Sequence, residues 1–482
     1  MGPEQSRRRW LTLAVLGVTQ LMVTLDATII NIALPRAQVA LSFSAADREW
    51  VVTAYALSFG SLLLLGGRLG DLWGRRTALL VGLVGFAGAS AVGGAATSFT
   101  MLVSARAVQG AFGAILAPAA LAALTTAFTD PDERARAFSI YGALAGSGAA
   151  IGLILGGALT QWASWRWCLY VNLVFALVAV VGVIPLVPGG RGPYHRHVDL
   201  LGAVLGSAGL FGVVYGLSHA VTASWSATLS WGSIVAGAVV LVLFVLAERR
   251  SSHPLLPLRV VLDRARGGSL AGLFLTNLAL FGAGLFLAYY LENSLGYSPL
   301  RTGIAFLPMV AAIAVSAQVA AARLITLSGP RPLVPAGMLL AALGLILFTR
   351  LPLRADYLGD VLPGLVLLGL GLGLVFAPGI ATATGRVAPA DAGAASASVN
   401  TVQQVGGSVG TALLNTLAVD ATARSLSGGG GSALAAARAA LHGFAVAYGW
   451  AAGILLGGAL VLVVLLPSVG SLSAPRVDQA SE

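Results

Sequence analysis

Long apolar stretches separated by short polar connections run through almost the whole chain. About 20 apolar residues are enough to cross a bilayer as an α-helix, whereas the strands of a membrane barrel alternate over about ten residues. The pattern therefore predicts an all-α polytopic membrane protein with fourteen transmembrane helices. Their expected ranges are 11–34, 50–67, 77–96, 101–127, 136–159, 168–187, 198–217, 229–247, 269–292, 302–322, 332–350, 358–380, 394–418 and 443–466.

Composition supports this interpretation and argues against a nucleic-acid-binding, disulfide-linked or metal-binding protein. Hydrophobic residues make up 57% of the 482 residues and charged residues 10%. The net charge of +10 could suggest a nucleic-acid partner, but all 28 basic residues are Arg, scattered singly or in small groups between apolar stretches. We therefore expect the lipid bilayer and no nucleic acid as a partner. The single cysteine, Cys168, excludes an internal disulfide bond, and no metal site is expected.

The distribution of arginine predicts the orientation in the membrane. An even number of helices puts both termini on one side, and the segments on that side carry 19 Arg against 8 on the other, with Arg106 inside a helix. The positive-inside rule then places both termini in the cytoplasm, with the protein in the cell membrane. Residues 1–10 and 467–482 are expected to be cytoplasmic. The arginines near the amino terminus look like a twin-Arg export signal, but the apolar run behind them is too long for one.

A weak internal repeat predicts two halves. Arg68-Leu69, Gly74 and Arg76 recur 255 residues later as Arg323-Leu324, Gly329 and Arg331, and Pro131, Gly148 and Gly152 recur 258 residues later as Pro389, Gly406 and Gly410. These offsets fit two parallel six-helix halves, 11–187 and 269–466, joined by a linker with two extra helices, 188–268. Parallel halves around a midplane site are typical of secondary transporters.

Asp26 stands inside the first predicted helix. An ionised Asp near a helix centre costs about 2.5–3.5 kcal/mol on insertion scales, so it marks a functional hypothesis, here the uptake and release of a proton. The alternative is that a buried Arg holds Asp26 permanently ionised, so that it only orients helices. Asp26 lies roughly 22 Å from the cytoplasmic start of its helix at 1.5 Å per residue. Arg106 and Tyr55 lie at compatible depths in the outer half of the bilayer, and Arg106 needs a partner there.

The connection between the second and third predicted helices reads Gly67-Arg68-Leu69-Gly70-Asp71-Leu72-Trp73-Gly74-Arg75-Arg76. It resembles the signature loop of the major facilitator superfamily. The resemblance implies a gating loop formed by Gly67, Asp71, Gly74, Arg75 and Arg76. In it, Asp71 would face the amino end of the helix starting near Ala394, where the helix dipole favours an anion. The alternative is a solvated turn that obeys the positive-inside rule.

Other stretches resemble the fourteen-helix drug:proton antiporters of that superfamily. They are Leu25–Pro35 in the first helix and Leu102–Gly110 in the fourth, whose Arg106 the resemblance links to proton transfer with Asp26. The fifth helix carries Gly148, Gly152, Gly156 and Gly157, whose spacing lets helices approach closely. It departs from the exporters' motif at Leu153, where the family usually has Pro. Trp165-Arg166-Trp167 and Asn172 match the family's outer loop and are expected to anchor structure.

Several polar residues are candidates for contact with a substrate. Glu292, at the outer edge of the ninth helix, could bind a cationic drug or a second proton, or it could be a solvated cap. Polar side chains at mid-depth are expected to face a cavity because lipid offers no partners, although they could also link helices. The expected cavity residues are Asn31, Tyr55, Gln109, Asn400, Gln403 and Gln404.

Together these features predict a monomeric secondary active transporter. It would export amphipathic or cationic drugs, dyes or antibiotics in exchange for protons by alternating access, with the proton gradient as the energy source and no cofactor. The chain has no phosphate-binding Gly-x-x-x-x-Gly-Lys loop. Alternatives are a proton-coupled exporter of one secondary metabolite or an importer of a nutrient. An enzyme or a receptor is disfavoured, because the sequence shows no catalytic motif and no connection long enough for a soluble output domain.

Overall fold

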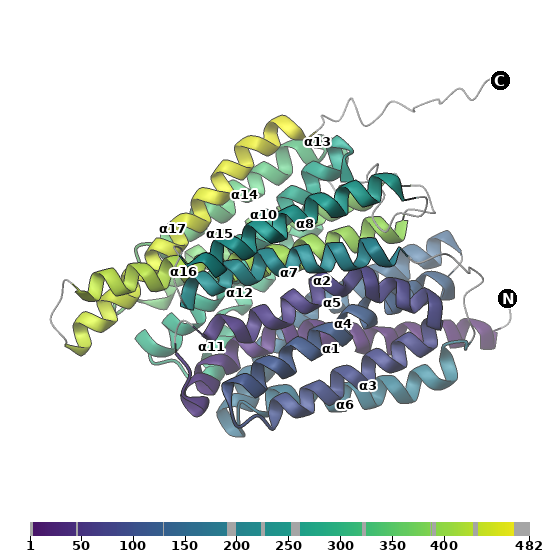
Figure 1. Cartoon of the computed structure of the whole chain (residues 1–482), viewed down its shortest axis with the longest axis horizontal. Coiled ribbons are helices and arrows are strands. Elements are labelled where there is room, and N and C mark those ends of the chain that lie inside the picture. Colours follow the sequence, from purple (N-terminus) through teal and green to yellow (C-terminus); the bar gives the residue numbers. More distant parts are fainter. Residues whose placement is uncertain are drawn as a thin grey trace.

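The computed structural model describes residues 3–466 apart from 45–46, 129, 190–198, 223–226, 252–260, 321–323, 386, 388–391 and 428–431. Its regular elements in that part of the chain are all helical (Figure 1). The first eight are α1 (Pro3–Leu41), α2 (Arg48–Trp73), α3 (Arg75–Gly94), α4 (Phe99–Ala127), α5 (Pro131–Trp162), α6 (Trp167–Leu186), α7 (Leu200–Thr222) and α8 (Thr228–Arg250). The others are α10 (Arg264–Tyr289), η1 (Tyr290–Ser294), α11 (Pro299–Ala305), α12 (Leu307–Val319), α13 (Ile325–Ser328), α14 (Pro330–Phe348), η3 (Tyr357–Val361), α15 (Leu362–Thr384), α16 (Ala392–Ser427) and α17 (Ala433–Leu465).

Each predicted range overlaps a helix of the structure, but the helix ends differ. Helix α1 starts eight residues before the predicted position, because its Arg-rich first turns remain helical beyond the apolar stretch. The predicted helix 302–322 is divided into α11 and α12 at Phe306, just before Pro308. Proline lacks an N–H and clashes with the preceding turn, which accounts for the break.

Ten helices among the described residues are long and apolar enough to cross a membrane, judged by length and composition. Shorter apolar helical stretches occur at Trp50–Leu63, Ile151–Trp162 and Leu201–Leu217. Helix α1 begins and α17 ends at the same end of the bundle (Figure 1). This agrees with an even number of crossings, while the count of fourteen stays a prediction.

The helices pack into two groups with separate hydrophobic cores. Helices α1 to α6 pack on one another, as do α10 to α17. The groups meet where α2 contacts α16 and where α5 contacts α11. Helix α7 packs on α8 and contacts both α2 and α16, so the additional helix pair lies along the boundary between the groups (Figure 1).

Two matched features show that the sequence repeat is a structural one. Gly74 between α2 and α3 and Gly329 between α13 and α14 both have positive φ, 85° and 69°, a conformation that side chains other than hydrogen disfavour. A Cβ atom on Gly152 of α5 would press on the carbonyl oxygen of Leu25 in α1, and one on Gly410 of α16 would collide with that of Leu278 in α10. Equivalent glycines therefore allow equivalent close helix contacts in the two groups.

Candidate functional site

The candidate site is a buried ion pair between the first and fourth helices. Arg106 Nη1 of α4 lies 2.6 Å from Asp26 Oδ2 of α1. The side chains are 1% and 0% exposed, respectively. The partner that the depth of Arg106 required is therefore Asp26. Such a pair gains from mutual attraction in a low-dielectric interior, but each charge also pays a large desolvation cost.

Two side-chain amides complete the surroundings of the carboxylate. Gln109 Nε2 donates to Asp26 Oδ1 at 2.8 Å, and Asn172 Nδ2 of α6 donates to the same oxygen at 2.7 Å. With Arg106, three donors point at one carboxyl group. An ionised carboxylate only accepts hydrogen bonds, so this arrangement fits the charged form of Asp26.

A second layer of contacts holds the donors in place. Ser90 Oγ of α3 accepts from Gln109 at 2.7 Å and from Asn172 at 3.2 Å. Arg106 Nε donates to the Val51 carbonyl oxygen of α2 at 3.2 Å, and its Nη1 donates to Gln109 Oε1 at 2.6 Å. Every member of this network lies in α1, α2, α3, α4 or α6, within the amino-terminal group.

An aromatic ring covers the arginine. The guanidinium carbon of Arg106 lies 4.3 Å from the centre of the Tyr55 ring, a cation–π contact. Gly110 permits this approach, because a Cβ atom there would collide with the Tyr55 carbonyl oxygen. The sequence thus places a glycine next to Gln109, at a point where α4 comes close to the α2 backbone.

Asn172 Oδ1 and the Tyr55 hydroxyl oxygen are buried with no hydrogen-bond partner among the described residues. A protonated Asp26 would carry an O–H donor and would need an acceptor. Asn172, whose Nδ2 already donates to Asp26, carries such an unpartnered acceptor on the same amide group.

Two of the expected cavity residues, Gln109 and Tyr55, instead contact the buried ion pair. Gln109 is 1% exposed and Tyr55 3% exposed, so neither lines an open cavity in this conformation. Asn31, Gln403 and Gln404 are half-buried, and Asn400 is exposed. Gln404 packs against Gly60, where α16 meets α2.

Glu292 lies at the boundary between the two helix groups, near Arg36 of α1, and not in the Asp26 network. It belongs to η1, a single π-helical turn, and its Oε1 is buried without a hydrogen-bond partner. Arg36 and Tyr289 are close enough to interact with its charge. The Tyr289 hydroxyl donates to Gln38 Oε1 at 2.8 Å, and the Arg48 guanidinium lies 3.9 Å from the Tyr289 ring centre, which ties α10 to α1 and α2.

The expected gating loop is described in part. Gly74 forms the turn, Gly67 faces Pro118 of α4, and Arg75 donates to the Thr126 hydroxyl of α4. Arg76 lies next to Gly189. The helix that Asp71 is expected to face is α16, which begins at Ala392, but the Asp71 side chain lies outside the described residues. The latch between the two halves therefore stays a prediction.

The glycines of α5 face two different neighbours. Gly148, Gly152 and Gly156 pack on α1, where added Cβ atoms would meet Thr24, Leu25 and Ile29. Gly157 instead faces Leu300 of α11 in the other group, and the Leu153 carbonyl oxygen abuts Gly303 there. The motif therefore joins the halves as well as packing α5 on α1, with Leu153 in the place of the family's proline.

Sequence reasoning missed the part that Asn172 plays. The neighbouring Arg166 does anchor structure, since its Nη1 donates to the carbonyl oxygens of Gly94 and Ala96 at the end of α3, at 2.9 and 2.5 Å. Asn172 lies six residues further along the chain, in α6, fully buried against Asp26. The sequence feature that could have predicted this role is an amide side chain inside an otherwise apolar helix, because a polar group there needs a partner.

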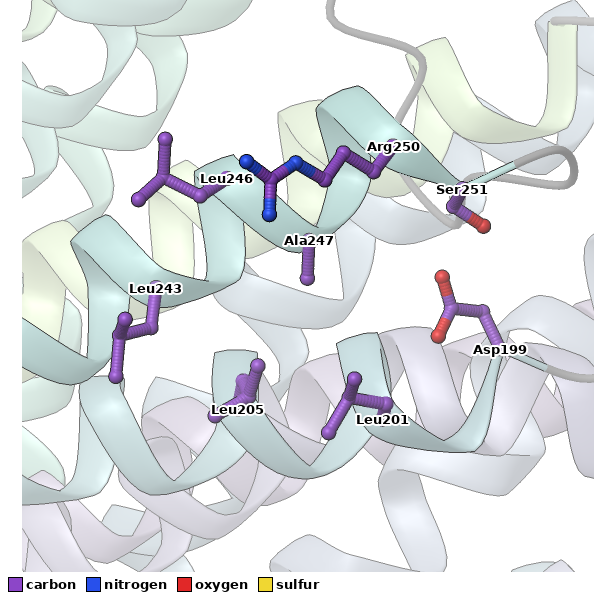
Figure 2. A pocket seen from close by; sticks show the side chains of 8 residues that line it. All are labelled: Asp199, Leu201, Leu205, Leu243, Leu246, Ala247, Arg250 and Ser251. Atoms are coloured by element: carbon purple, nitrogen blue, oxygen red, sulfur yellow. The ribbon is translucent and has the colours of Figure 1, made fainter.

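Two hollows occur away from this network. One, of about 560 Å³, lies between α7 and α8 (Figure 2). The other, of about 310 Å³, lies between α10 and α16 and is lined mainly by apolar side chains with Ser398 and Thr401. None of the expected cavity residues lines either one.

The fold and the buried ion pair define a membrane transporter, and comparison with known proteins establishes the family. Residues 16–411 match the Major Facilitator Superfamily, and the chain belongs to it. It is 48% identical to the puromycin resistance protein pur8 of Streptomyces alboniger, over 97% of this chain and 93% of that protein. It is 37% identical to the cephamycin export protein CmcT of Amycolatopsis lactamdurans, over 86% of each.

A solved structure supports the fold alone. The human organic anion transporter MFSD10 (TETRAN) superposes with a TM-score of 0.59 at 17% identity, covering 96% of this chain and 100% of that one. The family and these relatives are transporters and not enzymes, as the sequence predicts. The chain is thus a Major Facilitator transporter whose relatives include antibiotic export and resistance proteins.

Proposed function

We propose that this protein exports an antibiotic-type compound in exchange for protons, with Asp26 as the proton-binding group. The observation that carries the proposal is the fully buried Asp26–Arg106 pair with two further donors on the carboxylate. The unpartnered acceptor Oδ1 on Asn172, the amide that donates to the carboxylate through Nδ2, also supports it.

The pair couples protonation to helix movement for an electrostatic reason. When Asp26 takes up a proton, Arg106 loses its counter-charge while it is 1% exposed. A buried cation without a partner costs several kcal/mol. The protonated state is therefore stable only if α4 shifts relative to α1 or water reaches Arg106, and either change reshapes the amino-terminal group. Proton release restores the pair and the conformation described here.

The names of the relatives guide the choice of substrate. The 48% identical relative is named for puromycin resistance, and others are named for the export of cephamycin and of tetracenomycin C. One is named a multidrug resistance protein. The first candidate function is broad export of drugs and dyes, and the second is export of a single antibiotic-type metabolite. Puromycin is the first compound to test. Both termini would lie in the cytoplasm, and the protein would act as a monomer in the cell membrane.

The test uses purified protein in liposomes with an imposed pH gradient. Uptake of puromycin and of the dye ethidium is followed for the wild type and for Asp26→Asn. The matched control is Asp420→Asn, which breaks an exposed Asp–Arg pair with the same 2.6 Å separation. Gradient-driven accumulation that is lost in Asp26→Asn and kept in the control supports the proposal. Accumulation that survives in Asp26→Asn refutes the role of Asp26, and puromycin transport without ethidium transport selects the narrow exporter.

A further inference from the structure

The hollow between α7 and α8 is an open groove on the apolar surface of the additional helix pair. Leu201, Leu205, Leu243, Leu246 and Ala247 line most of it. Leu201, Leu243 and Leu246 are 63%, 47% and 44% exposed. In a chain of this family, side chains of this kind face the lipid. The groove is separate from the Asp26 network, since α7 and α8 contribute no residue to it.

Polar groups gather at one end of the groove. They are Asp199, which precedes α7, and Arg250 and Ser251, which end α8. Figure 2 shows that the Arg250 side chain turns back along α8, so that its guanidinium lies beside Leu246 and not next to Asp199. No ion pair to Arg250 occurs among the residues described. A guanidinium held alongside leucines is stabilised by an anion, and phosphate suits its planar set of donors.

An acidic group lies at the start of α7. Asp199 Oδ1 accepts from the backbone N–H of Gly202 at 2.8 Å, which fixes the carboxylate there. Asp199 lines the groove, whereas the nearby Glu248 is 3% exposed and does not line it. The Asp199 carboxylate makes this end of the groove suitable for a cation.

The order of these groups along the groove matches one class of lipid. From the middle of the helices outward come Leu205 and Leu243, then the Arg250 guanidinium beside Leu246, and then Leu201 and the Asp199 carboxylate (Figure 2). A phosphoethanolamine lipid presents its acyl chain, its phosphate and its primary ammonium in the same order. We infer that the groove between α7 and α8 binds a phosphoethanolamine phospholipid, with the phosphate on Arg250 and the ammonium on Asp199.

Headgroup chemistry separates this lipid from its relatives. A phosphocholine headgroup has the same charges but no N–H with which to donate to Asp199. A phosphoglycerol headgroup has the phosphate but no cation, and it would place an unbalanced negative charge near Asp199. Basic pockets between membrane helices generally favour anionic headgroups, so Asp199 is the residue that directs this groove toward a zwitterion.

The experiment measures lipid binding to the delipidated full-length protein by native mass spectrometry. Phosphatidylethanolamine, phosphatidylcholine and phosphatidylglycerol with identical acyl chains are titrated separately. Arg250→Gln should weaken binding of all three by about fivefold, the effect of one cation near a headgroup. Asp199→Asn should remove only the preference for ethanolamine over choline, since Asn remains a good helix cap. Arg249→Gln removes the same charge from an exposed neighbour that does not line the groove, and should change nothing.

Each other outcome overturns the inference in its own way. Equal binding of the three lipids would mean a non-selective annular contact. Tightest binding of phosphatidylglycerol would mean an anionic headgroup site in which Asp199 has no part. Absence of retained lipid would mean that the chain itself fills the groove, and equal losses in Arg249→Gln and Arg250→Gln would mean that only overall charge matters. Binding is measured without transport, so failure of the proposed export function leaves this test intact.

Discussion

Asn172 Nδ2 donates a 2.7 Å hydrogen bond to Asp26, while the side-chain oxygen of Asn172, Oδ1, is buried with no hydrogen-bond partner among the described residues. Replacement by leucine removes the donor and leaves the rest of the network in place. A hydrogen bond to a charged group contributes about 1.5–3 kcal/mol. Asn172→Leu should therefore destabilise the protein by about that amount at neutral pH and slow proton-driven transport. Thermal unfolding and the liposome assay check this, with Asn293→Leu on the exposed outer turn as the control.

Arg106 should be harder to replace when Asp26 is present than when it is not. Arg106→Leu leaves Asp26 buried without its counter-charge, which costs about 3–5 kcal/mol when one partner of a buried pair is removed. Asp26→Asn removes the uncompensated carboxylate, so the double variant should be more stable than Arg106→Leu alone. Unfolding midpoints of wild type, both single variants and the double variant measure this coupling. Additive losses would mean that packing of the arginine, and not its charge, is what matters.

The close contact at Gly410 predicts a position that does not tolerate alanine. A Cβ atom there would collide with the Leu278 carbonyl oxygen, whereas one on Gly453 of α17 would meet nothing within 4 Å. Overpacking typically costs about 1–3 kcal/mol. Gly410→Ala should lower the unfolding temperature, and Gly453→Ala should leave it unchanged or raise it slightly. Similar behaviour of the two variants would argue against the tight α10–α16 contact.

Tyr289 should control closure of the boundary where α10 meets α1 and α2. Tyr289→Phe removes the hydrogen bond to Gln38 and keeps the ring under Arg48, while Tyr289→Leu removes both contacts. Opening should therefore increase from wild type to Phe to Leu. Labelling of an Ala37→Cys reporter by a membrane-impermeant maleimide measures this, because Ala37 is 0% exposed in the same core cluster as Tyr289 and the native Cys168 is buried. Equal labelling in all three backgrounds would show that Tyr289 does not hold the boundary closed.

Asp263 predicts an acid-sensitive contribution outside the membrane-spanning helices. Burial alone would raise the pKa of Asp263, but hydrogen bonds from Arg266 and the Ala265 backbone N–H, together with the Arg266 charge, outweigh it and hold that pKa below its usual range. A lowered pKa in the folded state contributes stability above the unfolded-state pKa, and this is lost as the pH falls through the lowered value. Asp263→Ala should therefore cost about 0.5–2 kcal/mol at pH 7 and less at pH 3, measured by unfolding.

The residues show which parts of this structure can be predicted from the sequence. Helix positions follow from the apolar stretches, and the Asp26–Arg106 pair follows from depth, since each charge needs a partner at its own level. The break before Pro308 could also be predicted from the sequence, because proline disrupts the helical turn that precedes it. Ser90 and Asn172 could not be placed in the network, because depth does not fix the rotation of α3 and α6 about their axes. The burial of Gln109 and Tyr55 depends on how closely α2, α4 and α1 pack, which only the structure shows.

The matched glycine contacts fix a register between the two halves. Gly152 abuts Leu25 and Gly410 abuts Leu278, so the residue that follows each leucine occupies the equivalent place in its half. In the first half that residue is Asp26, and in the second it is Ala279, which is equally buried. The two halves share this helix contact, but the second half has no ionisable group at this position. The two halves therefore share their helix packing but differ in charge, because only the first half has an ionisable residue at this position. An Asp in place of Ala279 would be buried without a counter-charge like the one that Arg106 gives Asp26.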